Sequence, residues 1–286
     1  MVAIKFAHVV NPVNAKRPSD LVVAQPFCYK SMTDARRFSK KHAEIDLCAV
    51  YYPEDECMVA DGFRKLRPLG NSISNLRSFM VNRKLPLFKD ILDRVYNETD
   101  ADYIIQTNCD IILMPHFYEF VLRLIEKGSE SIIINKRCVP AIYRDVKDLP
   151  EVLSEIGSAH NGYDCFVYPR AKYKDFVIGD ICMGTPWSET TLAVSMAAYC
   201  NLTVLRNAIV TKHIGDTRTW LASNLTDYRQ HNAEQFAKVA FQIAKDKPDI
   251  LKDSVVRWMA FKMKYELQPH WCQECHDLCA ITTGLR

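Results

Sequence analysis

The sequence predicts an α/β fold in which a mainly parallel sheet is flanked by helices. Short apolar runs typical of strands alternate with longer segments whose apolar residues recur three and four positions apart. In residues 103–135 an apolar strand, a short strand, a helix and a further apolar strand follow one another, an order that favours parallel strands covered by helices. From residue 226 onward the pattern is mainly helical. We therefore expect one α/β domain over residues 1–225 and a helical C-terminal extension over residues 226–286.

The N-terminal part of the chain contains three apolar runs that predict strands, at residues 2–10, 21–24 and 47–52. A polar stretch over residues 33–42 opens with Thr33, a residue suited to cap a helix, and predicts a helix. A basic loop follows around residues 64–77. The next helix is indicated by apolar residues at helical spacing: Leu85, Phe88, Ile91, Leu92 and Val95.

The segment after residue 102 carries the clearest signals. A buried strand is expected over residues 103–106, and a helix over residues 115–127, because Pro115 suits a first helical turn and Gly128 suits a helix end. Further apolar runs predict strands at 131–135, 163–169, 202–205 and 208–211. Further helices are predicted at 191–200, 226–245 and 253–267.

Composition and charge narrow the class of protein. The chain has 286 residues, 48% hydrophobic and 25% charged, as in an ordinary globular protein. Its 37 Lys and Arg against 34 Asp and Glu give a net charge of +3, which argues against nucleic acid as a partner. No apolar run is long enough to span a membrane, and the N-terminus lacks a signal-peptide cleavage site. With 11 cysteines and no export signal, we expect a cytoplasmic protein with mostly buried thiols.

Asn108 and Asp110 interrupt an apolar run at the point where the strand over residues 103–106 ends. In open parallel sheets, ligands gather beyond the carboxyl ends of strands. The two-residue spacing directs both side chains the same way. Their amide and carboxylate oxygens therefore suit a divalent cation that bridges to a diphosphate. The alternative, which the sequence leaves open, is a tight turn in which Asn and Asp cap their own backbone.

Four segments occur in an order that is similar to a known family. Asn108-Cys109-Asp110, between a strand and a helix, resembles the D-x-D signature of nucleotide-sugar glycosyltransferases with the GT-A fold. Residues 160–197 resemble a pattern in GT-A-like proteins that reads D-x-F-V-x-P-R, then F-x-x-G, then Trp with an acid at a helix start. RKLPLFKDIL at 83–92 resembles the basic-LP segment, and TKHIGDTRTW at 211–220 resembles the stretch with a late His.

The resemblance implies a GT-A-like (Rossmann-like) fold and an enzyme that moves a sugar from a nucleotide-diphosphate sugar to a hydroxyl of a glycan or glycolipid. It implies Mn²⁺ or Mg²⁺ as cofactor, with Asp110 and His213 as metal ligands. Asp164 is expected to contact donor or acceptor. The residues expected to bind the nucleotide are Asn108, Arg83, Lys84, Lys89, Arg137 and Arg218; of Arg83, Lys84, Lys89 and Arg137 we expect at most two to be in contact, since most surface cations are solvated.

The transfer reaction itself calls for a base. In an inverting mechanism a carboxylate takes the proton of the acceptor hydroxyl on the side opposite the leaving group. Glu189, at the start of the helix over residues 191–200, is the candidate, and Trp187 is a candidate platform for the sugar. Simpler structural roles remain open: a helix-start acid favoured by the dipole for Glu189, a packed ring for Trp187 and a structural histidine for His213.

Two departures from the family pattern keep other functions open. Asn108 replaces the first Asp of D-x-D, and Ser188 separates Trp187 from the acid that usually follows directly. One alternative is a nucleotidyltransferase that activates a sugar phosphate, although residues 11–20 lack the Gly-rich basic loop of that class. The other alternative is a catalytically inactive module that binds a glycan or a partner, which the Asn at position 108 would suit.

The C-terminal tail offers two further interpretations. Cys272, Cys275 and Cys279, with His276 nearby, predict either a zinc site or small packing residues on one helix face. The C-x-x-C-H spacing also matches haem c attachment, which requires export. Residues 257–271 combine Trp with Lys and predict either a weak peripheral membrane contact or an ordinary amphipathic core helix.

Overall fold

The computed structural model describes residues 4–16, 19–160, 162–216 and 225–252, which form two compact units. The first, here the sheet unit, comprises the described residues of Met1–Gly70, Asp93–Tyr173 and Asn201–Thr217. The second, here the helical unit, comprises those of Asn71–Leu92, Lys174–Cys200 and Arg218–Arg286. This grouping differs from the expected division at residue 225, because helix α6 (Thr226–Asp246) packs against helix α5 (Ser188–Tyr199) inside the helical unit.

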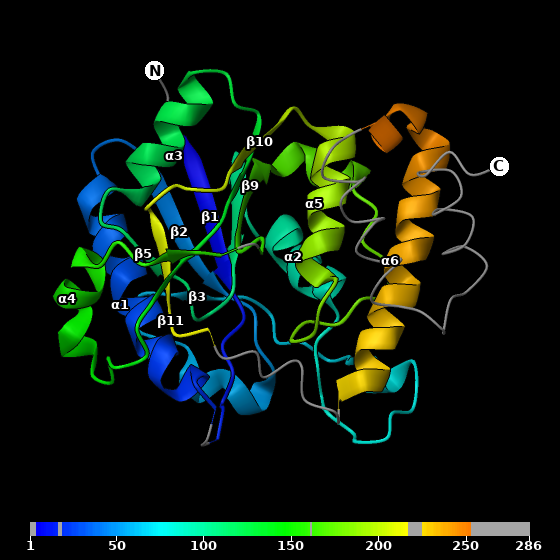
Figure 1. Ribbon diagram of the computed structural model, residues 1–286, viewed down its shortest axis with the longest axis horizontal. Coiled ribbons are helices and arrows are strands. Elements are labelled where there is room, and N and C mark those ends of the chain that lie inside the picture. The colour runs from blue at the N-terminus through cyan, green and yellow to red at the C-terminus, as the bar shows by residue number, and fades with distance from the viewer. Residues whose placement is uncertain (1–3, 17–18, 161, 217–224, 253–286) are drawn as a thin grey trace. The chain divides into compact units, whose positions relative to one another are not determined.

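The sheet unit contains a seven-stranded sheet in the order β10-β6-β9-β4-β1-β2-β3 (Figure 1). Its strands are β1 (Lys5–Val10), β2 (Glu44–Ala49), β3 (Arg64–Lys65), β4 (Tyr103–Thr107), β6 (Ser131–Ile134), β9 (Cys165–Pro169) and β10 (Leu202–Leu205). Neighbouring strands are parallel except for β9, which runs antiparallel to both β4 and β6. The predicted α/β fold with a mainly parallel sheet is therefore confirmed.

The direction of β9 brings the residue that precedes it to the carboxyl edge of the parallel strands. Cys165, the first residue of β9, pairs with Thr107 at the end of β4 and with Ile134 at the end of β6. Asp164 therefore lies beside the two segments that leave those strands, and one of these segments contains Asn108 and Asp110.

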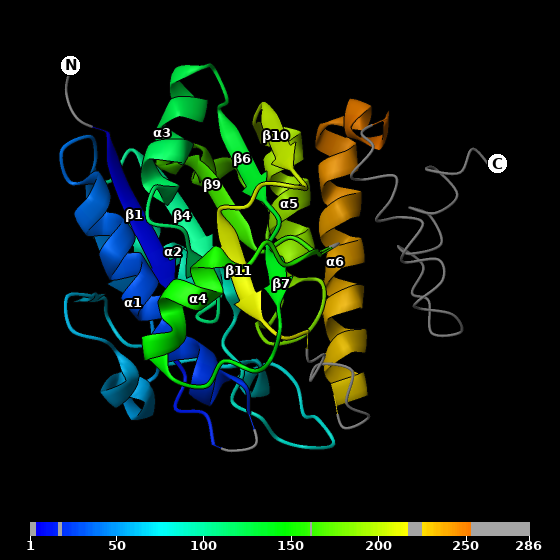
Figure 2. The same cartoon turned by 60° about the vertical axis from the view of Figure 1, so that its left-hand side comes forward.

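A second sheet of four strands, in the order β5-β11-β7-β8, belongs to the same unit, and Figure 2 labels its two middle strands, β11 and β7. Its strands are β5 (Ile112–Leu113), β7 (Arg137–Val139), β8 (Ser158–Ala159) and β11 (Thr211–Ile214). Lys212 of β11 pairs with both Ile112 and Arg137, so β11 carries His213 to the segment that follows Asp110. The sequence placed this last strand at residues 208–211, three residues too early, because its buried face includes the polar side chains of Thr211, Lys212 and His213.

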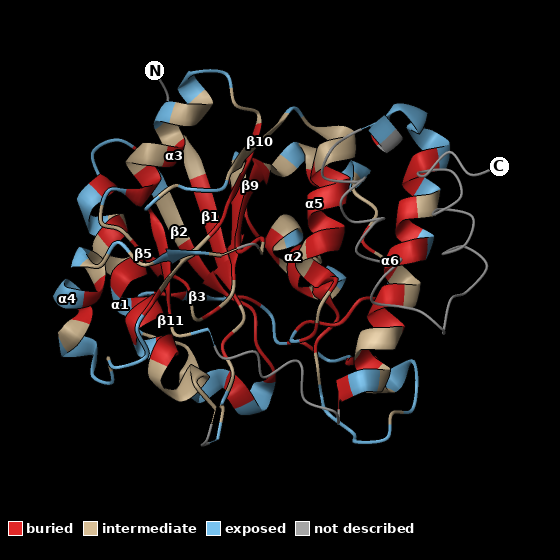
Figure 3. Cartoon of the chain, viewed as in Figure 1, coloured by how far each residue is buried: buried red, intermediate tan, exposed pale blue. Residues whose placement is uncertain are grey.

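Helices α1 (Leu21–Ser39) and α3 (Phe117–Glu126) provide the apolar cover of the seven-stranded sheet. Met32 of α1 and Phe117 of α3 belong to the same buried cluster as Ile105, Ile132 and Val167 of the strands. In Figure 3 the ribbon of strand β9 is largely red, the colour of buried residues. The prediction of a helix that ends before Gly128 is confirmed, and Gly128 has the positive φ of 97° that suits a glycine at a helix end.

The structure corrects the prediction of a short strand at residues 21–24 and a separate helix at residues 33–42. One helix, α1, covers residues 21–39, and its buried residues Ala24, Phe27, Cys28, Met32 and Ala35 follow helical spacing. Pro26 lies inside this helix and is exposed; it lacks the N–H that would bond to the carbonyl of Val22, but the helix continues past it.

The remaining helices are α2 (Phe88–Glu98) and α4 (Leu149–Ser154). In the helical unit, α5 and α6 lie side by side in both Figure 1 and Figure 2. The predicted helices at 85–95, 191–200 and 226–245 are confirmed, whereas the helix at 253–267 and the three tail cysteines lie outside the described residues. Within the described part of the chain, no helix is long and apolar enough to cross a membrane.

Candidate active site

Asn108 and Asp110 lie in a tight turn between β4 and β5. The carbonyl oxygen of Asn108 accepts a hydrogen bond from the backbone N–H of Ile111 at 3.3 Å. The turn that the sequence left open is thus present. It does not compete with a ligand role for Asp110, because a backbone bond holds the turn and the Asp110 carboxylate remains directed to His213.

Asp110 and His213 come together although 103 residues separate them in the chain. The Nε2 atom of His213 lies 3.2 Å from Oδ2 of Asp110. The Nδ1 atom of His213 donates to the backbone carbonyl of Gly215 at 2.9 Å. Since a carbonyl oxygen can only accept, Nδ1 carries a hydrogen, and Nε2 is the ring nitrogen that faces the carboxylate.

The electrostatics of this pair are strongly coupled. Burial alone would raise the pKa of Asp110, but the facing His213 and, more weakly, Lys136 hold the pKa of this carboxyl at about 2. Burial likewise opposes the charged form of His213, yet the Asp110 carboxylate raises the pKa of the ring above its usual value. Asp110 is therefore ionised at neutral pH, as a metal ligand must be.

One oxygen of Asp110 is a candidate ligand for a cation. Oδ1 of Asp110 is buried and has no hydrogen-bond partner among the described residues. A buried carboxylate oxygen without a partner is energetically unfavourable unless a ligand or ion binds to it. Together with Nε2 of His213 it offers two protein donors for Mn²⁺ or Mg²⁺. The described residues contain no group of three or more His, Cys, Asp or Glu arranged for a metal, so substrate oxygens and water would supply the other ligands.

Asp164 forms an ion pair with Lys136, a residue that sequence reasoning missed. The Lys136 ammonium lies 3.2 Å from Oδ1 of Asp164, with side chains only 13% and 7% exposed. Burial would raise the pKa of Asp164, but Lys136 lowers it, and Asp164 in turn raises the pKa of Lys136. The Lys136 ammonium therefore lies close enough to both Asp164 and Asp110 to stabilise two carboxylates.

Arg137, the neighbouring residue that the sequence favoured, is engaged elsewhere. Its guanidinium donates to the carbonyl oxygens of Ile156 at 3.1 Å and Gly157 at 2.6 Å. Consecutive residues in extended chain point to opposite sides, so only one of Lys136 and Arg137 can face Asp164. The contacts of Arg137 favour a structural role in holding the segment between α4 and β8.

His160 extends the polar cluster on the sheet unit. Its Nδ1 lies 3.4 Å from Oδ2 of Asp164, and its Nε2 lies 3.8 Å from Oδ1 of Asp216. Two neighbouring amides contribute further acceptors, because the side-chain oxygens of Gln106 and Asn135 are buried without a hydrogen-bond partner among the described residues. No short motif marks these residues, and only the strand register brings them to one edge.

Trp187 and Glu189 belong to the helical unit, where Glu189 lies in the first turn of α5. The Ser188 hydroxyl donates to Oε2 of Glu189 at 2.7 Å. Trp187 is 3% exposed and stacks on Phe236 of α6 at a centroid distance of 4.9 Å. A buried ring offers no face to a sugar in this conformation, which favours the packing role for Trp187.

The backbone of Trp187 is strained. Its φ of 85° is the positive value of a non-glycine residue, which is unfavourable for a bulky side chain. The preceding loop is fixed by Asn232, whose amide nitrogen donates to the carbonyls of Cys182 at 2.8 Å and Pro186 at 3.0 Å. This loop and the strained backbone of Trp187 fix the orientation of the first turn of α5 and therefore the position of Glu189.

The other basic candidates also belong to the helical unit. Arg83, Lys84 and Lys89 are exposed. Their expected role in nucleotide binding stays a prediction. Arg218 lies outside the described residues.

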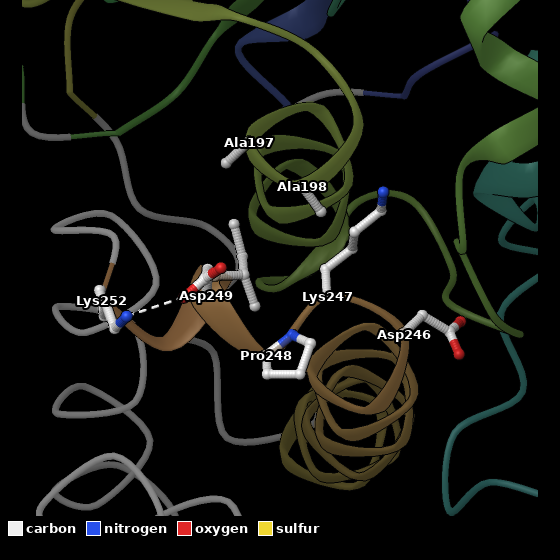
Figure 4. Close-up of a pocket in the computed structure, with 8 residues that line it drawn as sticks. Ala197, Ala198, Asp246, Lys247, Pro248, Asp249 and Lys252 are labelled. Atoms are coloured by element: carbon white, nitrogen blue, oxygen red, sulfur yellow. Dashed lines mark hydrogen bonds and ion pairs between the residues drawn. The ribbon is translucent and has the colours of Figure 1, made fainter.

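A separate hollow lies in the helical unit between the C-terminal ends of α5 and α6 (Figure 4). Ala197 and Ala198 form one side, and Lys247, Pro248 and Asp249 form another. None of the predicted site residues lines this hollow, so it is distinct from the Asp110–His213 pair of the sheet unit.

The strand order and the Asp110–His213 contact define an α/β protein with a mainly parallel sheet and a polar cluster at its carboxyl edge. No protein-family model matches the chain, and no curated protein sequence matches it. Solved structures, by contrast, match the chain. The chain is similar to residues 1–349 of TarS from S. aureus in complex with UDP-GlcNAc, with a TM-score of 0.52 and 12% identity over 98% of this chain and 82% of that chain.

Two further TarS crystal structures match the chain to a similar extent. TarS 1–349 alone matches with a TM-score of 0.53 and 12% identity over 98% of this chain and 81% of that chain. Its complex with UDP matches with a TM-score of 0.51 and 11% identity over 97% and 81% of the two chains. At this level of identity the likeness establishes the fold, and the GT-A-like architecture expected from the sequence is confirmed.

Proposed function

We propose that the protein is a glycosyltransferase that moves a sugar from a nucleotide-diphosphate sugar to a hydroxyl of a glycan or glycolipid. The observation that carries the proposal is the buried Oδ1 of Asp110, which has no hydrogen-bond partner in the part of the chain that the structure describes. It lies beside Nε2 of His213 at the carboxyl edge of a mainly parallel sheet. That edge is where open α/β sheets bind ligands. TarS, which shares the fold, has been crystallised with UDP-GlcNAc and with UDP, which supports a nucleotide sugar as donor.

The leaving group of this reaction is a nucleoside diphosphate that gains negative charge as the sugar departs. Asp110 and His213 would hold Mn²⁺ or Mg²⁺, which when bound neutralises part of that charge. Lys136, whose ammonium already acts on both Asp110 and Asp164, supplies positive charge at the same edge. The side-chain oxygens of Gln106 and Asn135, which have no partner among the described residues, are acceptors of the kind that sugar hydroxyls need.

Proton removal from the acceptor hydroxyl is assigned to Glu189, which makes the reaction inverting. Glu189 lies in the first turn of α5, where the positive end of the helix dipole favours a negative charge. Ser188 orients this carboxylate by donating to Oε2. The strained backbone of Trp187, directly before this pair, is of the kind that proteins retain where a side chain must be aimed.

A second candidate function is a binding module without catalysis. The observation that favours it is Asn108, which stands where D-x-D has an aspartate and removes one charge from the cation site. Such a module would bind the nucleotide sugar or a glycan without releasing the nucleoside diphosphate.

The proposal is tested by incubating the full chain with a panel of nucleotide sugars, with and without Mn²⁺, and measuring free nucleoside diphosphate. We expect metal-dependent release that falls about 100-fold in Asp110→Asn, the loss typical when one group that stabilises developing charge is removed. The exposed Asp61→Asn serves as the matched carboxylate control and should leave the rate unchanged.

Three outcomes separate the alternatives. Donor binding without turnover supports the binding module, and pyrophosphate release from a nucleoside triphosphate supports a nucleotidyltransferase. Turnover that survives Asp110→Asn unchanged contradicts the metal site. Retained anomeric configuration in the product contradicts Glu189 as base for an inverting reaction.

A further inference from the structure

Residues 71–89 form an acid-free, basic segment of the helical unit. The segment contains no Asp or Glu and four cations: Arg77, Arg83, Lys84 and Lys89. The whole chain has a net charge of only +3, so positive charge is concentrated here. Such local concentrations of Lys and Arg are typical of surfaces that meet anionic partners.

Large apolar side chains are exposed within the same segment. Met80 is 86% exposed, Leu76 is 52% exposed and Val81 is 42% exposed. Single exposed apolar residues are ordinary on protein surfaces, but three within six residues form a patch. Apolar side chains beside cations are the combination that inserts into the interface of a membrane.

The loop that carries these side chains, residues 76–84, is held in place by backbone hydrogen bonds and not by its exposed side chains Leu76, Met80 and Val81. The backbone N–H of Met80 donates to Oδ2 of Asp227 at 2.7 Å, and that of Arg83 donates to the hydroxyl of Tyr228 at 2.7 Å. The Tyr228 hydroxyl donates to the carbonyl of Val81 at 2.8 Å. Tyr228 itself is fully buried.

Phe79 adds a further anchor, since its ring stacks on Tyr228 at a centroid distance of 3.9 Å and an interplanar angle of 6°. In Figure 1 the loop is the cyan segment at the N-terminal turn of α6, and in Figure 3 it is largely pale blue. A loop that is fastened at Phe79, Met80 and Arg83 while Met80 projects outward is preorganised for contact, because little conformational freedom remains to be lost on binding.

We propose that loop 76–84 is a peripheral contact site for an anionic lipid surface, with Met80 and Val81 entering the interface and Arg83 and Lys84 facing the lipid phosphates. The acidic residues of α6 next to the loop are already engaged. Asp227 accepts from Met80 and Tyr228, and Glu234 pairs with Arg77 at 3.3 Å and accepts from Gln230. Arg77, Arg83 and Lys84 outnumber Asp227 and Glu234, so the loop and the adjoining turns of α6 together carry net positive charge, which fits phosphate headgroups.

This inference does not depend on the transfer reaction, because lipid binding requires neither donor nor metal. It also differs from the membrane contact predicted for residues 257–271, which lie outside the described residues. If both the loop and the proposed function are correct, the lipid surface would bring the protein to a lipid-linked acceptor.

The test is co-sedimentation of the full chain with vesicles of phosphatidylcholine and phosphatidylglycerol, compared with phosphatidylcholine alone. We expect binding to the anionic vesicles that weakens with added salt. The double variant Met80→Ser/Val81→Ser should bind about tenfold more weakly, since two apolar side chains no longer enter the interface. Ile142→Ser, at an exposed apolar residue of the sheet unit, is the matched control and should bind like the wild type.

Other results overturn the proposal. Equal binding of the wild type to neutral and anionic vesicles, or no binding to either, contradicts an anionic lipid site. Equal binding of the double variant and the wild type contradicts the role of this loop and leaves membrane contact to another part of the chain. Unchanged vesicle binding together with altered self-association in the double variant would assign the loop to a protein contact. Circular dichroism and thermal unfolding verify that the variants are folded.

Discussion

At the residue scale, the Lys136–Asp164 ion pair is the site feature whose energetics can be measured directly. Both side chains are mostly buried, so removing one charge leaves the other desolvated and unpaired. We expect Lys136→Met to lower the free energy of unfolding by about 3 kcal/mol at neutral pH, as measured by urea denaturation.

The double variant Lys136→Met/Asp164→Leu distinguishes an unpaired charge from lost packing. Because replacing both members of a buried pair by apolar residues is often neutral, most of the lost stability should return in the double variant. If the double variant lost as much free energy of unfolding as the two single variants together, a direct interaction between the two residues would be contradicted.

The same pair shows how far the site could be predicted from sequence. Asp110 and His213 were predictable as site residues, because Asp110 follows the predicted strand at 103–106 and His213 comes just after the apolar run at 208–211, and the structure places them in contact. Lys136 was not predictable as a site residue. It stands next to Arg137 between two strands, and composition alone does not say which of the two side chains faces the carboxyl edge. That choice depends on the register of β6 against β9, which no local pattern reveals.

At the scale of the element, the short helix α4 depends on a lysine from another element. Lys212 of β11 is fully buried, and its ammonium donates to the carbonyl oxygens of Val152 at 3.0 Å, Leu153 at 2.6 Å and Glu155. These are carbonyls at the C-terminal end of α4, which have no partner within the helix. Lys212 thus satisfies the helix end and offsets its negative dipole.

We expect Lys212→Met to lower the free energy of unfolding by about 2 kcal/mol, the contribution of a hydrogen-bonded charge after its burial is counted. Hydrogen exchange should show faster exchange in α4 than in the strands of the main sheet. Lys147→Met, an exposed lysine just before α4, is the control and should change stability by less than about 0.5 kcal/mol. Equal losses in the two variants would contradict the capping role.

Most elements could be predicted from local pattern, and the failures have a common cause. The strands and helices with clear apolar periodicity are confirmed, including β4, α3 and α6. The helix α1 was divided in the prediction because the apolar run at residues 21–24 resembles a short strand and Thr33 suggested a helix start. Packing of Met32 in the core of the main sheet and of Phe27 against the second sheet holds one continuous helix. Tertiary burial outweighed local propensity there.

At the scale of the whole molecule, the two units are built from interleaved segments, three for each. The chain passes from one unit to the other several times, so no composition change or linker marks a boundary. A single division at residue 225 was the natural expectation from sequence, because only the helical pattern changes there. The contact of α5 with α6 shows that the helical unit also draws on residues far upstream of 225.

The stability of the whole fold is also linked to pH through His8, which lies in β1 at the centre of the main sheet. His8 is fully buried, with Nδ1 2.9 Å from the Tyr118 hydroxyl and Nε2 2.9 Å from the Thr107 hydroxyl. Burial lowers the pKa of His8 to about 3, against about 6.5 in an unfolded chain. Between these values the unfolded chain binds a proton that the folded protein excludes.

Acidification should therefore destabilise the protein through His8: its contribution is complete above about pH 6.5 and is lost as the pH falls toward 3. We expect the free energy of unfolding of the wild type to fall by up to about 1.4 kcal/mol per pH unit more steeply than that of His8→Gln, because one proton is taken up on unfolding. Urea denaturation between pH 4 and pH 7 measures both slopes, and the exposed His116→Gln should follow the wild type. Parallel curves for wild type and His8→Gln would mean that the buried ring accepts a proton without unfolding the sheet around it.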